Sequence, residues 1–239
     1  MSKLFNIGMS LGVLSAVIAF SESAKAVPIS YTPTTFNFQG VNNVQAPSFV
    51  YNNVPHNLSV TVASNVASEP SPSPAMNTTV KAAGKVGKWT YGLGILDGSK
   101  NDAHFVDGKD KNDVLSFAFS QRVKLIAITF SFNDANHSLI NNFALFFDKD
   151  KNNSLTNNLV WKSKDIPGSS FYGTYTFTAL EQKNYNGKVF GIGAFGDNDM
   201  FKVASITVQQ VSSIPLPGAL PLILSGLVGL GLARQKKFA

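Results

Sequence analysis

Large apolar residues recur at every second position through most of this chain. Leu115, Phe117 and Phe119 alternate with small or polar residues, and the segment 143–147 repeats the pattern. Successive side chains of a β-strand point to opposite faces of the sheet, so this period of two predicts strands. The run 123–132 is apolar at both sets of alternate positions, which predicts a central strand covered on both faces. Its two predicted faces carry Ile126, Ile128, Phe130 and Phe132 on one side and Val123, Leu125 and Ala127 on the other.

The other strand candidates are short and are separated by turn residues. Pairs such as Asp97-Gly98 and Asn186-Gly187 favour turns, because Gly accepts a positive φ and Asn or Asp can bond to the neighbouring main chain. No stretch between residues 27 and 213 shows a comparable helical periodicity. Further strands are predicted at 58–62, 88–93, 171–178, 188–195 and 201–211. About eight short strands with this punctuation predict one all-β domain over residues 27–213, a β-sandwich of jelly-roll type.

Three features of the arrangement can be predicted as well. The first strands, near Phe36 and Leu58, are expected to pair with strands that follow Trp89. The Pro-rich stretch 68–74 is expected to form a long surface loop. Glycines 92 and 94 fall inside a strand candidate, which predicts a bulge or a close approach of another main chain.

The N-terminus has the three parts of a secretory signal peptide. Lys3 supplies a basic start, residues 4–20 form an apolar stretch, and Ala24 and Ala26 flank Lys25 in an Ala-x-Ala cleavage site. Residues 1–26 are therefore predicted to be removed by signal peptidase, which leaves a mature chain beginning at Val27.

The C-terminus, residues 214–239, also has a tripartite order. Ile214, Pro215, Leu216 and Pro217 open it, the apolar uncharged run 218–233 follows, and a basic cluster closes it. As a helix, that run would extend roughly 24 Å, which almost spans a bilayer. The cluster is predicted to stay on the cytoplasmic side and to leave the body outside. Its basic residues are Arg234, Lys236 and Lys237.

This tail resembles the PEP-CTERM sorting signal, in which a Pro-flanked motif precedes a transmembrane helix and an Arg/Lys cluster. Both prolines match, while Leu216 stands where the usual motif has Glu. The resemblance implies sorting by an exosortase from the inner membrane of a Gram-negative bacterium to the cell surface or extracellular matrix. It also implies an association with exopolysaccharide. An ordinary C-terminal membrane anchor without processing is the alternative.

Charge and cysteine content exclude several classes of function. The chain has 20 Lys+Arg and 14 Asp+Glu, of which five basic residues and one acidic residue lie in 1–26 or 214–239. The body thus keeps fifteen basic and thirteen acidic residues, a net charge of about +2. Nucleic-acid binding needs a clustered basic face, so we expect no nucleic-acid partner. The chain has no Cys, which excludes disulfides, thiolate metal sites and a Cys nucleophile.

Two Asp-rich stretches are candidates for calcium. Asp97, Asp107, Asp110 and Asp113 lie close together between two strand candidates, and carboxylate oxygens are the ligands that Ca²⁺ prefers. The segment 148–154 resembles the opening of an EF-hand loop but has neither the Gly nor the final carboxylate of that motif. Turn formation by Asp and Asn, and a polar loop between strands, are the alternatives that need no ion.

Aromatic rings are the candidates for carbohydrate contact. Trp89, Trp161, Tyr172 and Tyr175 are available, and Trp161 is predicted to be the exposed one because Val160 and Lys162 flank it near a strand end.

No catalytic residue is predicted, since His56, His104 and His137 lie far apart in loop-like segments. We therefore expect an exported structural or polysaccharide-associating protein. A secreted hydrolase that uses a pair of carboxylates is the alternative.

Overall fold

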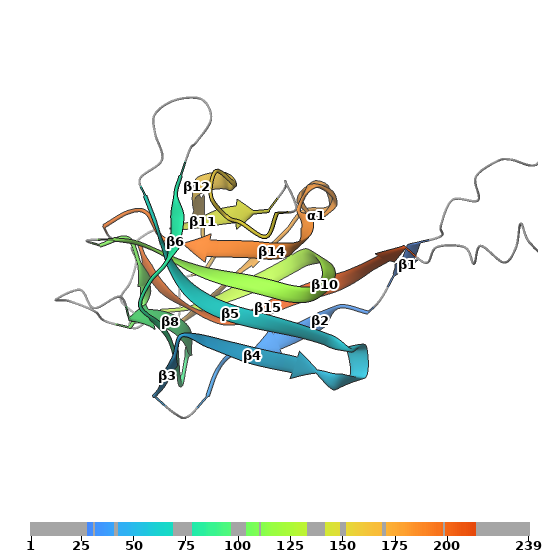
Figure 1. The fold of residues 1–239 in the computed structure, drawn as a ribbon, viewed down its shortest axis with the longest axis horizontal. Coiled ribbons are helices and arrows are strands. Elements are labelled where there is room, and N and C mark those ends of the chain that lie inside the picture. The colour runs from blue at the N-terminus through green and yellow to red at the C-terminus, as the bar shows by residue number, and fades with distance from the viewer. Residues whose placement is uncertain are drawn as a thin grey trace, which may run out of the picture. The chain divides into compact units, whose positions relative to one another are not determined.

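The fold is built around one long strand, β10 (Asn112–Ser131), in the computed structural model (Figure 1). Along its first half β10 pairs with β5 on one side and β14 on the other; along its second half it pairs with β15 and β13. All of these pairings are antiparallel. The neighbours on one side, β5 and β15, therefore diverge near the middle of β10, and the sheet bends there.

The structure describes residues 28–30, 32–40, 43–68, 78–96, 104–109, 111–132, 142–148, 152–168, 171–197 and 199–213. Residues 30–212 form one compact unit. The described part is mostly strand, which confirms the all-β prediction. Besides β10, its elements are β1 (Pro28–Ser30), β2 (Thr34–Asn37), β3 (Val44–Ala46), β4 (Ser48–Asn53), η2 (Val54–His56), β5 (Leu58–Ala67), β6 (Val80–Ala82), β7 (Lys85–Trp89), β8 (Gly92–Leu96), β9 (Val106–Asp107), β11 (Asn142–Phe147), β12 (Leu159–Asp165), β13 (Tyr172–Thr176), α1 (Ala179–Asn184), β14 (Asn186–Gly193) and β15 (Met200–Ser213).

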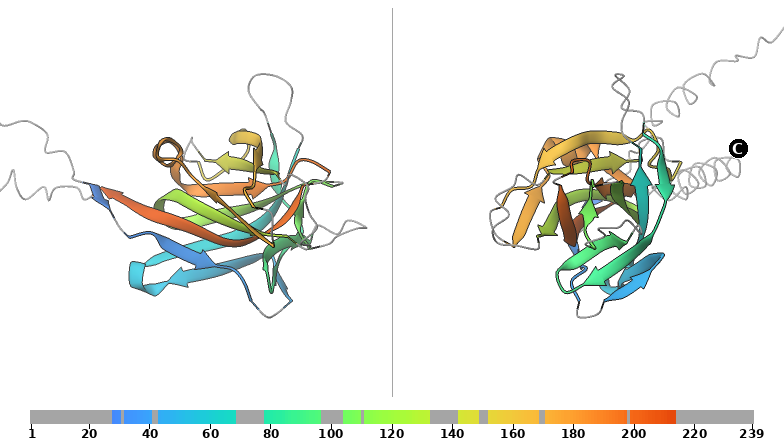
Figure 2. Two further views of the ribbon diagram at one scale, coloured as in Figure 1. Left: turned by 180° about the vertical axis from the view of Figure 1, so that it is seen from behind. Right: turned by 90° about the vertical axis from the view of Figure 1, so that its left-hand side faces the viewer.

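The strand pairings form a circuit. It runs from β10 through β5 to β4, across Pro47 to β3, and back through β7, β8 and β15 to β10. Proline has no N–H and cannot continue the ladder, so β3 and β4 on either side of Pro47 pair with different strands. The view along the strands shows the sheet curling around its interior (Figure 2). Strands β14, β11 and β12 extend the sheet beyond β10.

The core is dominated by phenylalanine. Phe38, Phe117, Phe130, Phe143 and Phe190 are fully buried in one continuous cluster. Most of their ring contacts are edge-on or tilted, as in that of Phe130 with Phe201 at 5.0 Å between centroids, whereas Phe190 is stacked on Phe147. The alternating Phe residues of the sequence thus supply the interior of the domain.

The prediction that the run 123–132 has two opposite apolar faces is wrong. Val123 and Leu125 are buried in the same core as Ile128 and Phe130. The pairing with β15 shifts register between Leu125 and Ala127, so an extra residue, Ile126, reverses the alternation at that point. With this bulge taken into account, one face of β10 packs on the same core from Leu115 to Phe130. Near the start of the strand the opposite face is buried as well, because Val114 belongs to a second apolar cluster.

One further strand prediction is corrected, one helix was missed, and the predicted strand pairings and close approach are confirmed. Residues 88–93 contain a hairpin turn between β7 and β8 rather than one strand, and the six-residue helix α1 was not predicted. Phe36 pairs with Ile206 and β5 pairs with β10, as expected for strands that follow Trp89. Gly92 has φ +138°, and a Cβ on it would lie 2.5 Å from the carbonyl oxygen of Val203, which confirms the close approach.

Both terminal signals lie outside the described residues. These are the signal peptide 1–26 with Ala24 and Ala26, and the sorting tail 214–239 with its helix 218–233. Within the ranges given above, no helix is long and apolar enough to cross a membrane. The boundaries 27 and 213 of the domain stay predictions.

Candidate functional site

One outer face of the sheet is lined by short hydroxyl and amide side chains. Strands β2, β15, β10 and β13 lie side by side there, and their registers align two transverse rows of residues. We call this surface the polar face. Its rows are Thr35, Thr207, Ala127 and Thr176, and Asn37, Ser205, Thr129 and Thr174.

Hydrogen bonds between neighbouring side chains order this face. The hydroxyl groups of Thr35 and Thr207 lie 2.9 Å apart, and those of Thr129 and Thr174 lie 3.1 Å apart. Neither row contains a charged residue. Each hydroxyl has further donor and acceptor capacity, so the face is an array that can exchange hydrogen bonds with another hydroxylated surface. Within each row, residues on adjacent strands lie about 4.8 Å apart.

Exposed aromatic side chains lie at one end of the polar face. Tyr172 is 40% exposed and is the register partner of Ser131 at the end of β10. Its hydroxyl accepts a hydrogen bond from Nε2 of Gln39 at 2.9 Å. Phe171 and Tyr91 are each 48% exposed, and their carbonyl oxygens accept hydrogen bonds from Phe132 N and Ser131 Oγ. Three accessible aromatic residues are therefore anchored around the last residues of one strand.

The prediction that Trp161 is exposed is wrong. Its ring is partly buried against the core, with Phe143, Tyr175, Phe177 and Tyr185 at 5.4–6.3 Å between centroids. Its Nε1 is enclosed without a hydrogen-bond partner in the described structure. A ring held among four others presents no open face for a sugar, and Tyr172 is the member of the original four rings that is exposed.

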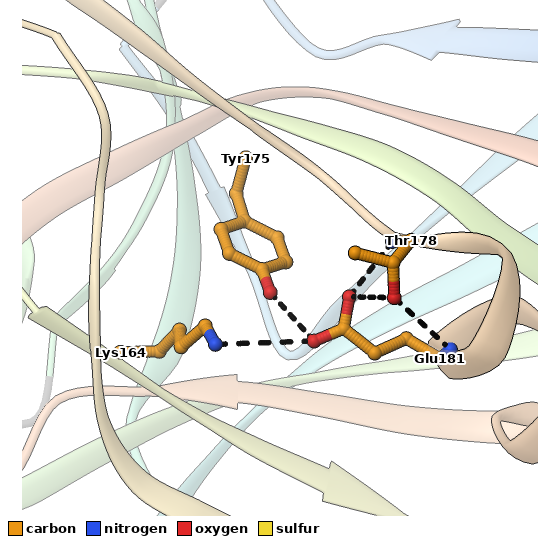
Figure 3. Close-up of polar contacts among 4 residues, drawn as sticks. All are labelled: Lys164, Tyr175, Thr178 and Glu181. Carbon is orange, nitrogen blue, oxygen red and sulfur yellow. Dashed lines mark hydrogen bonds and ion pairs between the residues drawn. The ribbon is translucent and has the colours of Figure 1, made fainter.

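A network of polar contacts covers the edge of this aromatic cluster (Figure 3). Thr178 caps helix α1: its Oγ1 accepts from Glu181 N, and Glu181 Oε2 accepts from Thr178 N at 2.8 Å. Tyr175 donates its hydroxyl hydrogen to Glu181 Oε1 at 2.7 Å, and Lys164 Nζ lies 3.9 Å from the same oxygen. Lys164 Nζ also lies 5.5 Å from the ring centroids of Trp161 and Tyr175.

The network sets the charge of Glu181. Burial raises the pKa of this carboxyl, but hydrogen bonds from Thr178 and Tyr175 and the charge of Lys164 outweigh it, so the pKa is lowered overall. Burial and the Glu181 carboxylate raise the pKa of Tyr175 well above its ordinary value. Glu181 therefore stays ionised and Tyr175 protonated, which suits a structural cap that joins α1 to β13.

The calcium residues are only partly described, since Asp97 and Asp110 lie outside the described ranges. Asp107 Oδ1 accepts a hydrogen bond from Lys109 N at 3.0 Å, which is a turn-forming contact. Asp113 lies within β10, opposite Val66, and is 4% exposed. Among residues that the structure describes, no group of three or more His, Cys, Asp or Glu could hold a metal ion. The calcium site stays a prediction.

The other acidic candidates hold loops together. Both oxygens of Asp148 accept main-chain hydrogen bonds, from Asn152 N and Asn153 N, which is the expected polar loop between strands. Asp199 accepts from Asn142 N and Gly196 N at 3.0 Å each, and burial raises its pKa against these bonds.

Among the shallow surface hollows of the described part are one of about 470 Å³ and one of about 350 Å³. Asn52, Asn57 and Gln121 are among the residues that line the larger, and Asn65, Ser116 and Lys188 are among those that line the smaller. Neither lining includes a carboxylate in the described structure.

No protein family matches this chain, and no curated protein sequence matches it either.

Sequence reasoning did not find the polar face, Tyr91 or Phe171. Alternation alone was a usable signal for the face, because Thr174 and Thr176 lie between buried residues of β13. The alignment of four strands, which creates the face, depends on pairings between residues up to about 170 positions apart.

Proposed function

We propose that this protein is an exported component of the bacterial cell surface or extracellular matrix, and that it associates with polysaccharide through the polar face. The observation that carries the proposal is an uncharged array of hydroxyl and amide groups bordered by exposed Tyr172 and Phe171. Polysaccharide chains present hydroxyl groups along their length and apolar C–H faces that pack on aromatic rings. Both kinds of contact are available at this surface.

The absence of charge in the two rows favours a neutral glycan as the ligand. An acidic polymer would bring carboxylates onto hydroxyl groups with no cation in the rows to pair with them. A neutral chain exchanges its hydrogen bonds with water for similar bonds to the face, so binding at each sugar is weak and adds up over many contacts.

The terminal segments supply the proposed route. The signal peptide 1–26 directs export and is removed by signal peptidase, and an exosortase processes the tail that begins at Ile214. The membrane span 218–233 anchors the chain until then. The proposed fine architecture is a jelly-roll-like sandwich, supported by the bend of the sheet at β10 and the core that it encloses.

A pull-down with insoluble polysaccharide tests the binding proposal. Full-length protein is mixed with a neutral glucan or with an acidic polysaccharide, and the bound fraction is measured. We expect binding to the neutral polymer and about tenfold weaker binding for Tyr172→Ala, which corresponds to the loss of one aromatic stacking contact of about 1.4 kcal/mol. Leu180→Ala removes a side chain that is 67% exposed in α1 and serves as the matched control.

Equal binding of wild type and Tyr172→Ala would contradict the proposed site. The alternative, a secreted hydrolase, predicts a different result in the same mixture: reducing ends would appear in solution over time, and a non-catalytic binding protein releases none.

A further inference from the structure

A lysine is enclosed by aromatic side chains beside the polar face. Lys202 in β15 is the register partner of Ser131, so it lies in the transverse row that contains Tyr172. It is only 8% exposed. Its Nζ lies 3.8 Å from the ring centroid of Phe105 and 5.5 Å from that of Trp89.

The enclosure is built by the sequence around it. Trp89 is stacked on the imidazole of His104, with centroids 4.9 Å apart and planes 11° apart. Gly87 makes room for the Trp89 ring, since a Cβ there would lie 1.8 Å from a ring carbon. Gly94 makes room for the main chain of His104, whose carbonyl oxygen would lie 2.0 Å from a Cβ. The segment 104–105 is held down by a hydrogen bond from Ile95 N to Phe105 O.

The ammonium group of Lys202 has no polar partner among the described residues. The titratable groups on the described elements around it are His104, Asp107 in β9 and Tyr172 in β13, and Lys202 forms no ion pair with a described residue. Burial lowers the pKa of Lys202 to about 8. A long cationic side chain normally keeps its charge in water, and perturbed ionisable groups of this kind gather at functional sites.

We propose that Lys202 is a carbonyl-reactive amine, whose Nζ forms an imine with the aldehyde group of an open-chain aldose. The lone pair of the neutral amine adds to the carbonyl carbon to give a carbinolamine, which loses water to form the C=N bond. No oxidant or reductant takes part, and the reaction is reversible. The aldose as reactant rests on the proposed function, because the polar face would bring the reducing end of a glycan to this row. The reactivity of the Lys202 amine does not depend on the proposed function.

The expected advantage of Lys202 follows from two opposing effects. A pKa of about 8 rather than the ordinary 10.4 or so makes the neutral amine over a hundredfold more abundant near pH 7.5. The attraction between the ammonium and the ring faces favours the protonated form and reverses part of this gain. About a tenfold advantage over an ordinary lysine is left. The Phe105 ring must move off Nζ for an aldehyde to enter, and the measured rate includes that step.

Reductive trapping tests the proposal on the full-length protein. Glyceraldehyde and cyanoborohydride are added between pH 6 and 10, and the alkylated lysines are quantified by peptide mass spectrometry. Lys124 is the internal control, because it lies on the outer side of β10 and is more exposed. We expect Lys202 to be alkylated about tenfold faster than Lys124 at pH 7.5, with a rate that begins to level off only near pH 9. Lys202→Met should lose this labelled peptide alone.

Labelling of Lys202 no faster than that of Lys124 overturns the proposal. A second labelling experiment, with a glucan oligosaccharide that has a free reducing end, distinguishes failure of this proposal from failure of the proposed function. If the polar face delivers the glycan, Tyr172→Ala slows labelling by the oligosaccharide and leaves labelling by glyceraldehyde unchanged. If the oligosaccharide labels the wild type and Tyr172→Ala at equal rates, the proposed role of the polar face is contradicted and the proposal of a reactive amine is not.

Discussion

Replacing Lys202 with Met should stabilise the folded protein at neutral pH. The pKa of Lys202 falls from 10.5 to about 8 on burial, and each pKa unit corresponds to about 1.4 kcal/mol, so holding the charge inside costs about 3 kcal/mol. The contacts of the ammonium with Phe105 and Trp89 return up to about 2 kcal/mol. Met removes the charge, fills a similar volume and makes its own sulfur–aromatic contacts. We expect a net gain of about 2 kcal/mol.

The gain should disappear at high pH. Below pH 8 the folded and unfolded chains both bind the proton, so the cost of burial is present in full. Between pH 8 and 10.5 the unfolded chain keeps the proton that the folded chain has lost, so the stability of the wild type rises with pH. Above that window neither state is protonated, and the desolvation cost that Met avoids is gone.

Calorimetry at pH 7 and pH 10.5 measures both effects. For a chain of this size, about 2 kcal/mol corresponds to a rise in Tm of roughly 4–8 °C at pH 7. Lys124→Met, on the same side of the sheet but more exposed, should change Tm by less than about 2 °C. If Lys202→Met lowers Tm at pH 7, or raises it equally at both pH values, the reasoning from desolvation is refuted.

Three other predictions concern the cap, the ion and the processing. Glu181→Gln should destabilise the protein by about 1–2 kcal/mol above pH 5. Because folding lowers the pKa of Glu181, its contribution to stability is present above the pKa of the unfolded chain and is lost as the pH falls through the pKa of the folded chain. The free energies of unfolding of variant and wild type, measured in urea, should therefore converge near pH 3. If calcium binds the loop near Asp107, millimolar calcium should raise Tm and Asp107→Ala should abolish the rise; identical melting in calcium and chelator rejects the site. Mass spectrometry of surface protein from exosortase-containing cells should give a chain that starts at Val27 and ends near Pro217, and an intact tail would indicate a permanent anchor.

The sequence predicts the class of the fold because the core side chains obey a local rule. Phe117, Phe119, Phe143 and Leu145 alternate within single strands, so their inward direction is visible without knowing any partner strand. The same rule fails at Ile126, where a bulge reverses the alternation. Such a bulge is defined by the partner strand β15, about eighty residues further along the chain, and nothing in the local pattern marks it.

The candidate site residues are limited in the same way, because their exposure depends on other strands. Tyr172 and Trp161 both lie in strands and both were candidates for an exposed ring, yet only the packing of β12 against Tyr175 and Tyr185 decides that Trp161 is covered. The exposure of a side chain on a strand depends on which other segments of the chain pack over it. Residue type and local alternation do not contain that information.

Lys202 is the sharpest case of this kind. In the alternating pattern of β15 it occupies a position on the side away from the core, where a lysine is expected to reach solvent. Its burial comes from Phe105 and Trp89, about a hundred residues earlier, and these can lie over β15 only because Gly87 and Gly94 have no side chains. Gly94 was visible in the sequence as a sign of close approach and Lys202 as a strand residue, whereas no sequence feature singled out Gly87. The glycines and the lysine are brought together only by the pairing of β7, β8 and β15. The enclosure of this charged group by aromatic rings can therefore be recognised only once the fold is known. Its chemistry can then be argued from its contacts.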